Sequence, residues 1–253
     1  MFLDSASLRS SIVSHAKTLG YVPSSARAAK ATVDVILNTN LLTATMPAGT
    51  VFSTIVGDTS FQFSTIESFV KSNTGNTIPF VGVDIYEGTF ITTRYLVDSS
   101  DIDQRFLITD NRADTTTLTV VVQTSSTDSS SNTFTEATDI TQVTSGSNVF
   151  FLQEVEAGLF EVYFGDGVIG NALSDDNIVI LTYVVSNKTV ANGASNFDNV
   201  SSIAGITDIS VATSAVASAG SEPESLSSIK YNAPLDFASQ GRCVTSEDYK
   251  VFA

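Results

Sequence analysis

From Ala31 onward, apolar and polar side chains alternate in short runs, and this alternation constrains the fold more than any other feature of the chain. Val33, Val35 and Leu37 alternate with polar neighbours, which predicts a strand with one buried face. Turn-forming pairs such as Asp166-Gly167 interrupt the runs about every ten residues, a spacing typical of all-β domains. The sequence therefore predicts a mainly β protein.

Further strand candidates follow the same signals. They are residues 41–46, 50–56, 61–65, 79–86, 89–97, 105–109, 116–123, 149–155, 159–164 and 178–185. Charged residues make up only 15% of the chain, so Ser, Thr and Asn take their place on the surface. Such chains are usually β-rich, since Thr and Val suit a pleated, half-buried surface.

Residues 6–19 predict a helix that precedes the first strand. Leu8, Ile12, Ala16 and Leu19 recur at spacings of four, four and three residues, which places them in one apolar stripe. Gly20 stands where helices often end in a left-handed residue. The helix is therefore amphipathic and ends before Gly20.

A second helix is expected in the C-terminal part of the chain. Ser221 and Glu224 have the spacing of a capping box, in which the two side chains satisfy two backbone donors. We expect this helix to end by Asn232 or Ala233, because Pro234 has no backbone N–H and disfavours helix in the residue before it.

Two segments and one further helix start carry weaker signals. Residues 123–131 are a low-complexity run of mostly Ser, Thr and Asp with nothing to bury, so we expect a mobile loop or a strand extension there. Residues 191–220 are rich in Ala, Ser, Asn and Gly and alternate imperfectly, so we interpret them as an extended connector. Thr245 with Asp248 marks another capped helix start.

These segments predict a mainly β protein with flanking helices, of the α+β class. We divide the chain into an N-terminal helical segment (1–30), a β-rich domain that forms an antiparallel meander or a sandwich-like structure (31–190), an extended connector (191–219) and the start of a C-terminal α/β segment (220–253). We expect the last part to be truncated, because the chain ends a few residues into a capped helix.

Charge and cysteine content exclude several classes of protein. Lys and Arg number 12 and Asp and Glu number 27, and a net charge of −15 argues against nucleic-acid binding. A single cysteine, Cys243, excludes an internal disulfide and fits assembly in a reducing cytosol. We expect no secretory signal, because Asp4 precedes any apolar run, and no run reaches the roughly 18 apolar residues of a membrane helix.

The residues that carry catalytic chemistry are few. The single histidine, His15, lies beside the apolar stripe of the first predicted helix and has no evident partner, so a structural role is expected. Arg242 could lower the pKa of the Cys243 thiol, but one thiol and one distant histidine do not define a nucleophile and its base. We therefore expect no catalytic residues.

Metal and phosphate sites are not expected either. Asp clusters could offer oxygen ligands to Ca²⁺, but they lack the glycine and terminal glutamate of a calcium loop, so we interpret them as solvated turns. The clusters are Asp98, Asp101 and Asp103, and Asp175 and Asp176 with Asp166. Residues 164–170 are glycine-rich but lack the Lys and Ser/Thr of a phosphate loop, so they predict a tight turn with positive φ.

Four motifs in order support a resemblance to a known family. Each is short, and together they span nearly the whole chain. They are Arg9 with Ala16 to Ser24, Met46-Pro47-Ala48-Gly49-Thr50-Val51-Phe52, Phe164-Gly165-Asp166-Gly167, and the closing segment from Ile229 to Leu235 with Arg242 to Thr245, Asp248 and Tyr249. The chain resembles the baseplate-J-like family of contractile phage tails, and most closely the baseplate wedge proteins of T4-like phages.

The resemblance implies a scaffold without catalysis, cofactor, metal or small-molecule substrate. Proteins of this kind sit in the virion, pair with a second copy of themselves and join other wedge subunits around the tail tube. They are assembled in the host bacterial cytoplasm and rearrange when the tail contracts. Family members are longer, so we expect this chain to be a fragment. We also expect an exposed apolar stripe on the N-terminal helix to await a partner.

Two alternatives stay open from the residues alone. Strand spacing and a Ser/Thr/Asn surface also suit a carbohydrate-binding or adhesin-type β module, although Trp is absent and Tyr numbers only 7. A carboxylate-based hydrolase would need two carboxyl groups about 5–10 Å apart, a distance that sequence cannot supply.

Overall fold

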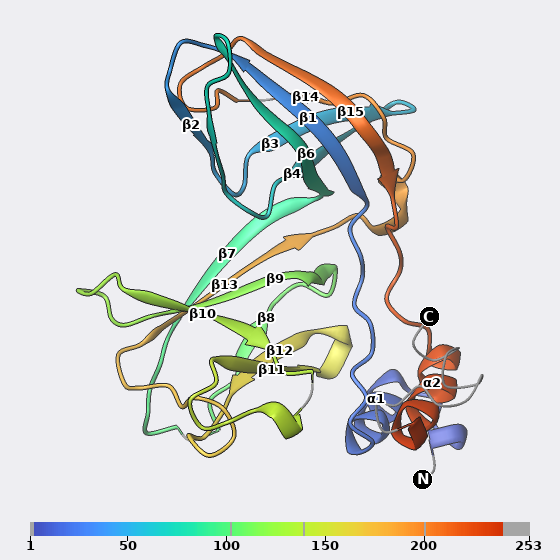
Figure 1. The fold of residues 1–253 in the computed structure, drawn as a ribbon. Helices are drawn as coiled ribbons and strands as arrows, with labels where there is room; N and C mark the ends of the chain where they lie inside the picture. The colour runs from blue at the N-terminus through green and yellow to red at the C-terminus, as the bar shows by residue number, and fades with distance from the viewer. Residues whose placement is uncertain (1–2, 102, 139, 200, 240–253) are drawn as a thin grey trace.

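The computed structural model describes residues 3–101, 103–138, 140–199 and 201–239, and in these residues the alternating segments form two large β-sheets and a two-stranded ribbon. The large sheets lie one above the other, and the two α-helices lie together beside the lower one (Figure 1). The protein is therefore mainly β with flanking helices, as the sequence predicts.

A six-stranded sheet takes strands from both halves of the chain. Its order is β14-β3-β4-β6-β1-β15. The strands are β1 (Lys30–Asn38), β3 (Val51–Val56), β4 (Thr59–Ser64), β6 (Thr77–Glu87), β14 (Asp198–Asn199) and β15 (Ile209–Ser218), and the separate ribbon pairs β2 (Thr43–Met46) with β5 (Phe69–Ser72). Alternation in β1 buries Val33, Val35 and Leu37 completely, which confirms the predicted strand.

A seven-stranded sheet has its own core. Its order is β7-β13-β9-β10-β11-β12-β8. The strands are β7 (Thr89–Leu96), β8 (Phe106–Ile108), β9 (Ala113–Gln123), β10 (Ser131–Glu136), β11 (Val149–Glu154), β12 (Phe160–Phe164) and β13 (Ile178–Val185). Phe106, Leu181 and Tyr183 are among its buried residues, and this cluster is separate from the core of the six-stranded sheet.

The predicted antiparallel meander is wrong in two respects. Strands β10 and β11 run parallel, and strands consecutive in sequence, such as β7 and β8, lie at opposite edges of the sheet. Each large sheet instead bends around its own core, so both sheets are barrel-like. In the seven-stranded sheet the two edge strands approach each other, and the Tyr95 hydroxyl of β7 donates to the carbonyl oxygen of Leu107 in β8. Sequence alternation reports which side chains are buried but carries no information on which strands pair.

The connector predicted over residues 191–219 is wrong where the chain forms strands, at residues 198–199 and 209–218. Strand β15 lies within it and pairs with β1, with Val211 opposite Val35. Phe197 and Ile203 of the same segment are buried in the core of the six-stranded sheet. The sequence signal for β15 is weak because β15 is an edge strand that is exposed at most of its positions. Its sequence therefore need not alternate strictly between apolar and polar residues. The proposed domain boundaries stay a prediction.

The described residues also contain short 3-10 turns and, besides β14 and β15, two strands that the sequence did not predict. The 3-10 turns are Leu3–Ser5, Ile140–Gln142, Glu156–Gly158 and Lys188–Ala191. The two unpredicted strands are β5 and β10. The low-complexity run at 123–131 connects β9 to β10, and its two ends belong to these paired strands, so it forms the expected strand extension. None of the described helices is long and apolar enough to span a lipid bilayer.

The first helix, α1 (Arg9–Thr18), lies within the predicted range. Gly20 follows it with φ +81°, the left-handed conformation expected at this position. Tyr21 and Leu19 donate their backbone N–H groups to the Ala16 carbonyl, which closes the C-terminal turn. The predicted end of the helix is therefore confirmed.

The second helix, α2 (Leu226–Ser239), differs from the prediction at both ends. Ser225, not Ser221, is the N-cap: its hydroxyl oxygen accepts the N–H of Ser228 at 3.2 Å. Ser221 instead forms a β-bridge with Arg27, and the Glu224 carboxylate accepts the Tyr21 hydroxyl and side chains of α2 rather than closing a capping box with Ser221. The helix also continues through Pro234. Burial of Ile229 and Ala233 against α1 offsets the lost hydrogen bond.

Replacing Pro234 with alanine is expected to stabilise α2. The change supplies a backbone N–H in the helix interior and removes the ring clash, which should slow amide exchange in α2 and raise the free energy of unfolding by about 2 kcal/mol. Amide hydrogen exchange and urea unfolding measure both effects. The control is Ser227→Ala, also exposed on α2, which leaves the backbone donors unchanged and should alter stability by less than about 0.5 kcal/mol. An unchanged or less stable P234A protein would contradict this account.

Candidate assembly interface

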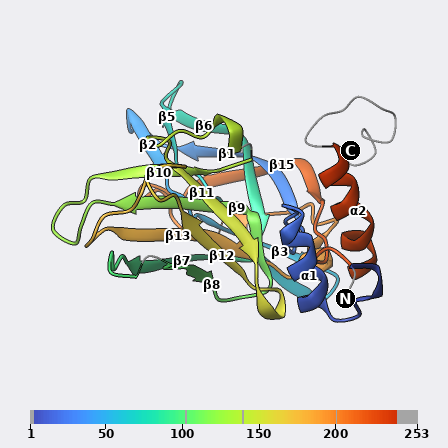
Figure 2. The ribbon, with the colours of Figure 1, turned by 90° about the horizontal axis from the view of Figure 1, so that it is seen from below.

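The two helices form a small unit with its own buried core. Ile12 and Ala16 of α1 pack against Ile229 and Ala233 of α2, and all four side chains are fully buried. Figure 2 shows the two helices side by side at one end of the molecule. The prediction that the apolar stripe of α1 is exposed and awaits a partner is therefore wrong, except for Leu8, because α2 covers it.

An ion pair attaches this helix pair to the seven-stranded sheet. The Arg9 guanidinium binds both carboxylate oxygens of Glu154, at 2.6 and 2.8 Å, and Glu154 lies at the end of β11 with no exposed side-chain surface. Arg9 also donates to the Glu224 carbonyl at 2.7 Å. A buried carboxylate needs such a partner, because leaving it unpaired in a low-dielectric site is costly. Arg9 thus joins α1, the segment before α2 and the sheet.

Glu224 collects hydrogen bonds from both ends of the chain. Its carboxylate accepts the Tyr21 hydroxyl at 2.9 Å and the Asn232 amide at 3.0 Å, along with the Ser24 backbone N–H and the Ser228 hydroxyl. Burial and the bond to Glu224 raise the pKa of Tyr21, so its hydroxyl stays protonated and donates. Two motifs far apart in sequence, around Tyr21 and around Asn232, therefore meet here.

The outer side of α2 carries exposed apolar side chains. Tyr231 is 63% exposed and Phe237 is 57% exposed, and Pro234 lies between them. These three residues are spaced by three positions, so they follow one side of the helix. Large aromatic side chains that are exposed to solvent often anchor protein interfaces. We call Tyr231, Pro234 and Phe237 the α2 face.

Sequence reasoning missed both the ion pair and the α2 face. Arg9 belongs to one of the motifs, but nothing near it in sequence identifies Glu154 as its partner. The α2 face was missed because the helix was expected to end before Pro234, which left Phe237 outside it. A predicted helix that continued through Pro234 would have placed Tyr231 and Phe237 on the same helix.

One of the residues considered for catalysis, His15, lies in the part of the chain that the structure describes. His15 is half-buried on α1, and its carbonyl oxygen accepts the Thr18 hydroxyl at 2.7 Å. Arg242, Cys243 and the helix start at Thr245 and Asp248 lie outside the described residues.

The acidic turns act as caps for their own backbone. Asp98 accepts the N–H and hydroxyl of Ser100, which lowers the pKa of Asp98, and Asp175 accepts the Ser99 N–H. Asp98, Asp101 and Asp166 also line a cavity of about 250 Å³. Within 3–101, 103–138, 140–199 and 201–239, no three His, Cys, Asp or Glu side chains are grouped so that they could hold a metal ion.

The glycine-rich segment at 164–170 is a tight turn, as expected. Gly167 and Gly170 have φ of +85° and +83°, and the Asp166 carboxylate accepts the N–H groups of Val168 and Ile169. These bonds lower the pKa of Asp166. A carboxylate, rather than a phosphate, thus occupies the backbone donors of this turn.

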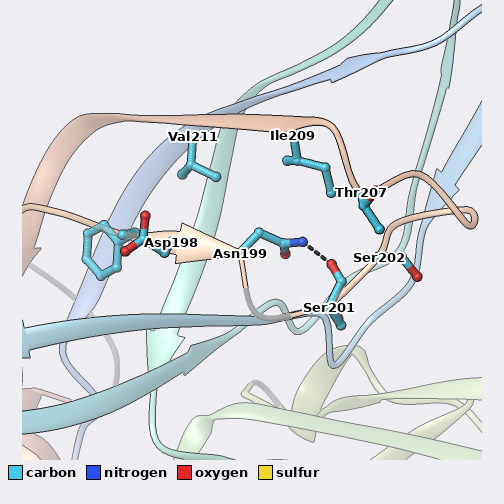
Figure 3. Close-up of a pocket in the computed structure, with 8 residues that line it drawn as sticks. Asp198, Asn199, Ser201, Ser202, Thr207, Ile209 and Val211 are labelled. Carbon is cyan, nitrogen blue, oxygen red and sulfur yellow. Dashed lines mark hydrogen bonds between the residues drawn. The ribbon is translucent and has the colours of Figure 1, made fainter.

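Another cavity lies where β14 and β15 approach each other without pairing (Figure 3). It measures about 280 Å³, and the Asn199 side-chain amide donates to the Ser201 carbonyl at its rim. The lining residues include neither histidine nor cysteine; they are Phe197, Asp198, Asn199, Ser201, Ser202, Thr207, Ile209 and Val211. The cavity therefore lacks the two residue types, thiol and imidazole, that were considered for nucleophile and base.

Comparison with known proteins identifies the class. Residues 91–195 match the family described as bacteriophage baseplate wedge protein gp6, third domain, and this range covers nearly all of the seven-stranded sheet. The chain is a relative of the baseplate wedge proteins of T4-like phages. One curated relative is baseplate wedge protein gp6 of Enterobacteria phage T4, to which the chain is 25% identical over 280 residues. That match covers 99% of this chain and 41% of the relative's length.

Proposed function

We propose that the chain is a structural subunit of a phage tail baseplate wedge and acts by protein–protein assembly, not by catalysis. The observation that carries this proposal is the similarity to a baseplate wedge protein along nearly the whole chain. The proposal places the chain in the tail baseplate of the virion, after assembly in the host bacterial cytoplasm.

The α2 face is the proposed site of assembly. The underlying helix pair is already packed, so Tyr231 and Phe237 are not needed for its core. An aromatic surface on a firmly attached helix suits a groove or helix on another subunit. The proposed partners are other baseplate wedge subunits and a second copy of this chain, arranged around the tail tube.

The carbohydrate-binding alternative is not favoured, because the relative is a baseplate protein. A hydrolase would need an acid and a second carboxylate facing a common cleft. Among the described residues, the acidic turns instead use their carboxylates on local backbone N–H groups.

The test is the mass in solution of the purified protein, alone and mixed with each other wedge protein of the same phage. We expect a dimer or a hetero-complex by light scattering. The double variant Tyr231→Ala/Phe237→Ala should weaken that complex about tenfold or more and leave the free energy of unfolding nearly unchanged.

A matched control removes two exposed apolar side chains from the six-stranded region. Val70→Ala/Val81→Ala changes residues that are 67% and 69% exposed and should leave assembly intact. If the wild-type protein stays monomeric and binds no wedge protein, the proposed function fails. If both double variants assemble like the wild type, the α2 face is not the site.

A further inference from the structure

We propose that the junction between the two large sheets is a rigid connection, so that the sheets move as one body. From their separate cores alone, the two sheets would be expected to move relative to each other. The hydrophobic clusters of the two sheets are separate, and parts of a chain with separate cores usually move relative to each other.

The chain passes through the junction four times. The first crossing, residues 24–30, leads from the helix pair to β1, and the second, residues 87–89, joins β6 to β7. The third, residues 185–192, leaves β13, and the fourth, residues 218–225, leads from β15 to α2. All four can be followed in Figure 1.

The second and third crossings are in direct contact. Glu87 is fully buried, and its two carboxylate oxygens accept the backbone N–H of Asn187 at 2.8 Å and its side-chain amide at 2.7 Å. Burial raises the pKa of Glu87, whereas the bonds from Asn187 and the charge of Arg112 act in the other direction. Gly88 lies so close to the third crossing that a Cβ atom there would be 2.2 Å from the Val185 carbonyl oxygen.

The first crossing is held by both neighbours. Ala29 accepts the backbone N–H of Glu87 at 2.9 Å, which links the first and second crossings. Asp114, 1% exposed at the start of β9, accepts the N–H of Ala28 at 2.8 Å. The hydroxyl of Ser25 accepts the N–H of Thr115 at 2.9 Å, so the first crossing is also fixed to the seven-stranded sheet.

The fourth crossing is hydrogen-bonded to both the first and the third. Arg27 and Ser221 exchange two backbone hydrogen bonds, at 3.0 and 3.1 Å, which join the first and fourth crossings. The side-chain amide of Asn192 donates to the Gly220 carbonyl and accepts the Gly220 backbone N–H, both at 3.0 Å, and these bonds join the third and fourth crossings.

Each crossing is thus bonded to two others, in the order first, second, third, fourth and back to the first. Rotation of one sheet against the other would break several of these bonds at once. Two of the acceptors, Glu87 and Asp114, are buried carboxylates, and an unsatisfied buried carboxylate is especially costly. This closed set of contacts is the physical basis of the rigid junction.

The direct test measures distances between spin labels in the full chain with Cys243→Ser. One pair places a cysteine at Val81 of β6 and another at Leu96 of β7, both exposed. The control pair, at Ile55 and Val81, lies within the six-stranded sheet. We expect distance distributions of equal width for the two pairs. A clearly broader or two-peaked distribution for the Val81–Leu96 pair would overturn the proposal.

Variants test whether the named contacts cause the rigidity. Gly88→Ala, whose Cβ meets Val185, should broaden the Val81–Leu96 distribution, while Gly57→Ala, with φ +60° but open space, should not. If Gly88→Ala does not fold, Glu87→Gln replaces it, and it should speed amide exchange at Asn187, whose N–H the Glu87 carboxylate accepts, about tenfold. Unchanged widths and unchanged exchange in the variants would show that these contacts do not hold the sheets.

Discussion

Replacement of Arg9 by alanine is expected to lower the free energy of unfolding by about 3–5 kcal/mol, because it leaves the Glu154 carboxylate buried without its partner. The Glu154 side chain has no exposed surface, so water cannot solvate its charge in place of the guanidinium. Urea unfolding measures the loss. The helix pair should also lose its attachment to β11, which faster amide exchange in α1 would report.

A matched arginine variant provides the control for this prediction. Arg112 forms an exposed pair with Asp110, with side chains 49% and 29% exposed, so Arg112→Ala should cost about 1 kcal/mol or less. The double variant Arg9→Met/Glu154→Gln removes both charges and should recover much of the stability lost in R9A. If R9A costs no more than R112A, the ion pair does not anchor the helix pair.

Replacement of Phe63 by alanine is expected to cost about 3–5 kcal/mol, the usual range for removing a fully buried phenylalanine. Phe63 of β4 makes an edge contact with Phe197, with ring centroids 4.8 Å apart. The cavity would therefore also loosen the segment before β14. Urea unfolding with circular dichroism detection gives the change in free energy.

Phe237→Ala is the control, because it removes a phenylalanine side chain that is not buried. Phe237 is more than half exposed on α2, so its loss should change stability by less than about 0.5 kcal/mol. Equal effects of the two substitutions would mean that Phe63 does not stabilise the core of the six-stranded sheet.

The β-strands could be predicted because their signal is local. In β1, alternate side chains must point to opposite faces, so Val33, Val35 and Leu37 report burial without knowledge of any partner strand. The end of α1 at Gly20 was predictable for the same reason, because a left-handed residue is a property of the backbone at one position.

The candidate interface could be predicted only in part. The motifs around Tyr21 and Asn232 pointed to the phage baseplate, and both lie at Glu224. Their meeting point, the burial of the α1 stripe and the exposed α2 face depend on contacts between residues about 200 positions apart. Sequence patterns carry no record of such contacts.

By itself, then, the sequence determined the β-rich class, most strand positions, the first helix and the relationship to baseplate wedge proteins. Tertiary structure alone decided that β15 joins β1 in a sheet, that α2 continues through Pro234, and that Arg9 binds Glu154. Periodicity and turn chemistry act over a few residues, and the sequence displays them directly. The free energy of burying Val211 beside β1 or Ile229 beside α1 arises only when distant segments pack together.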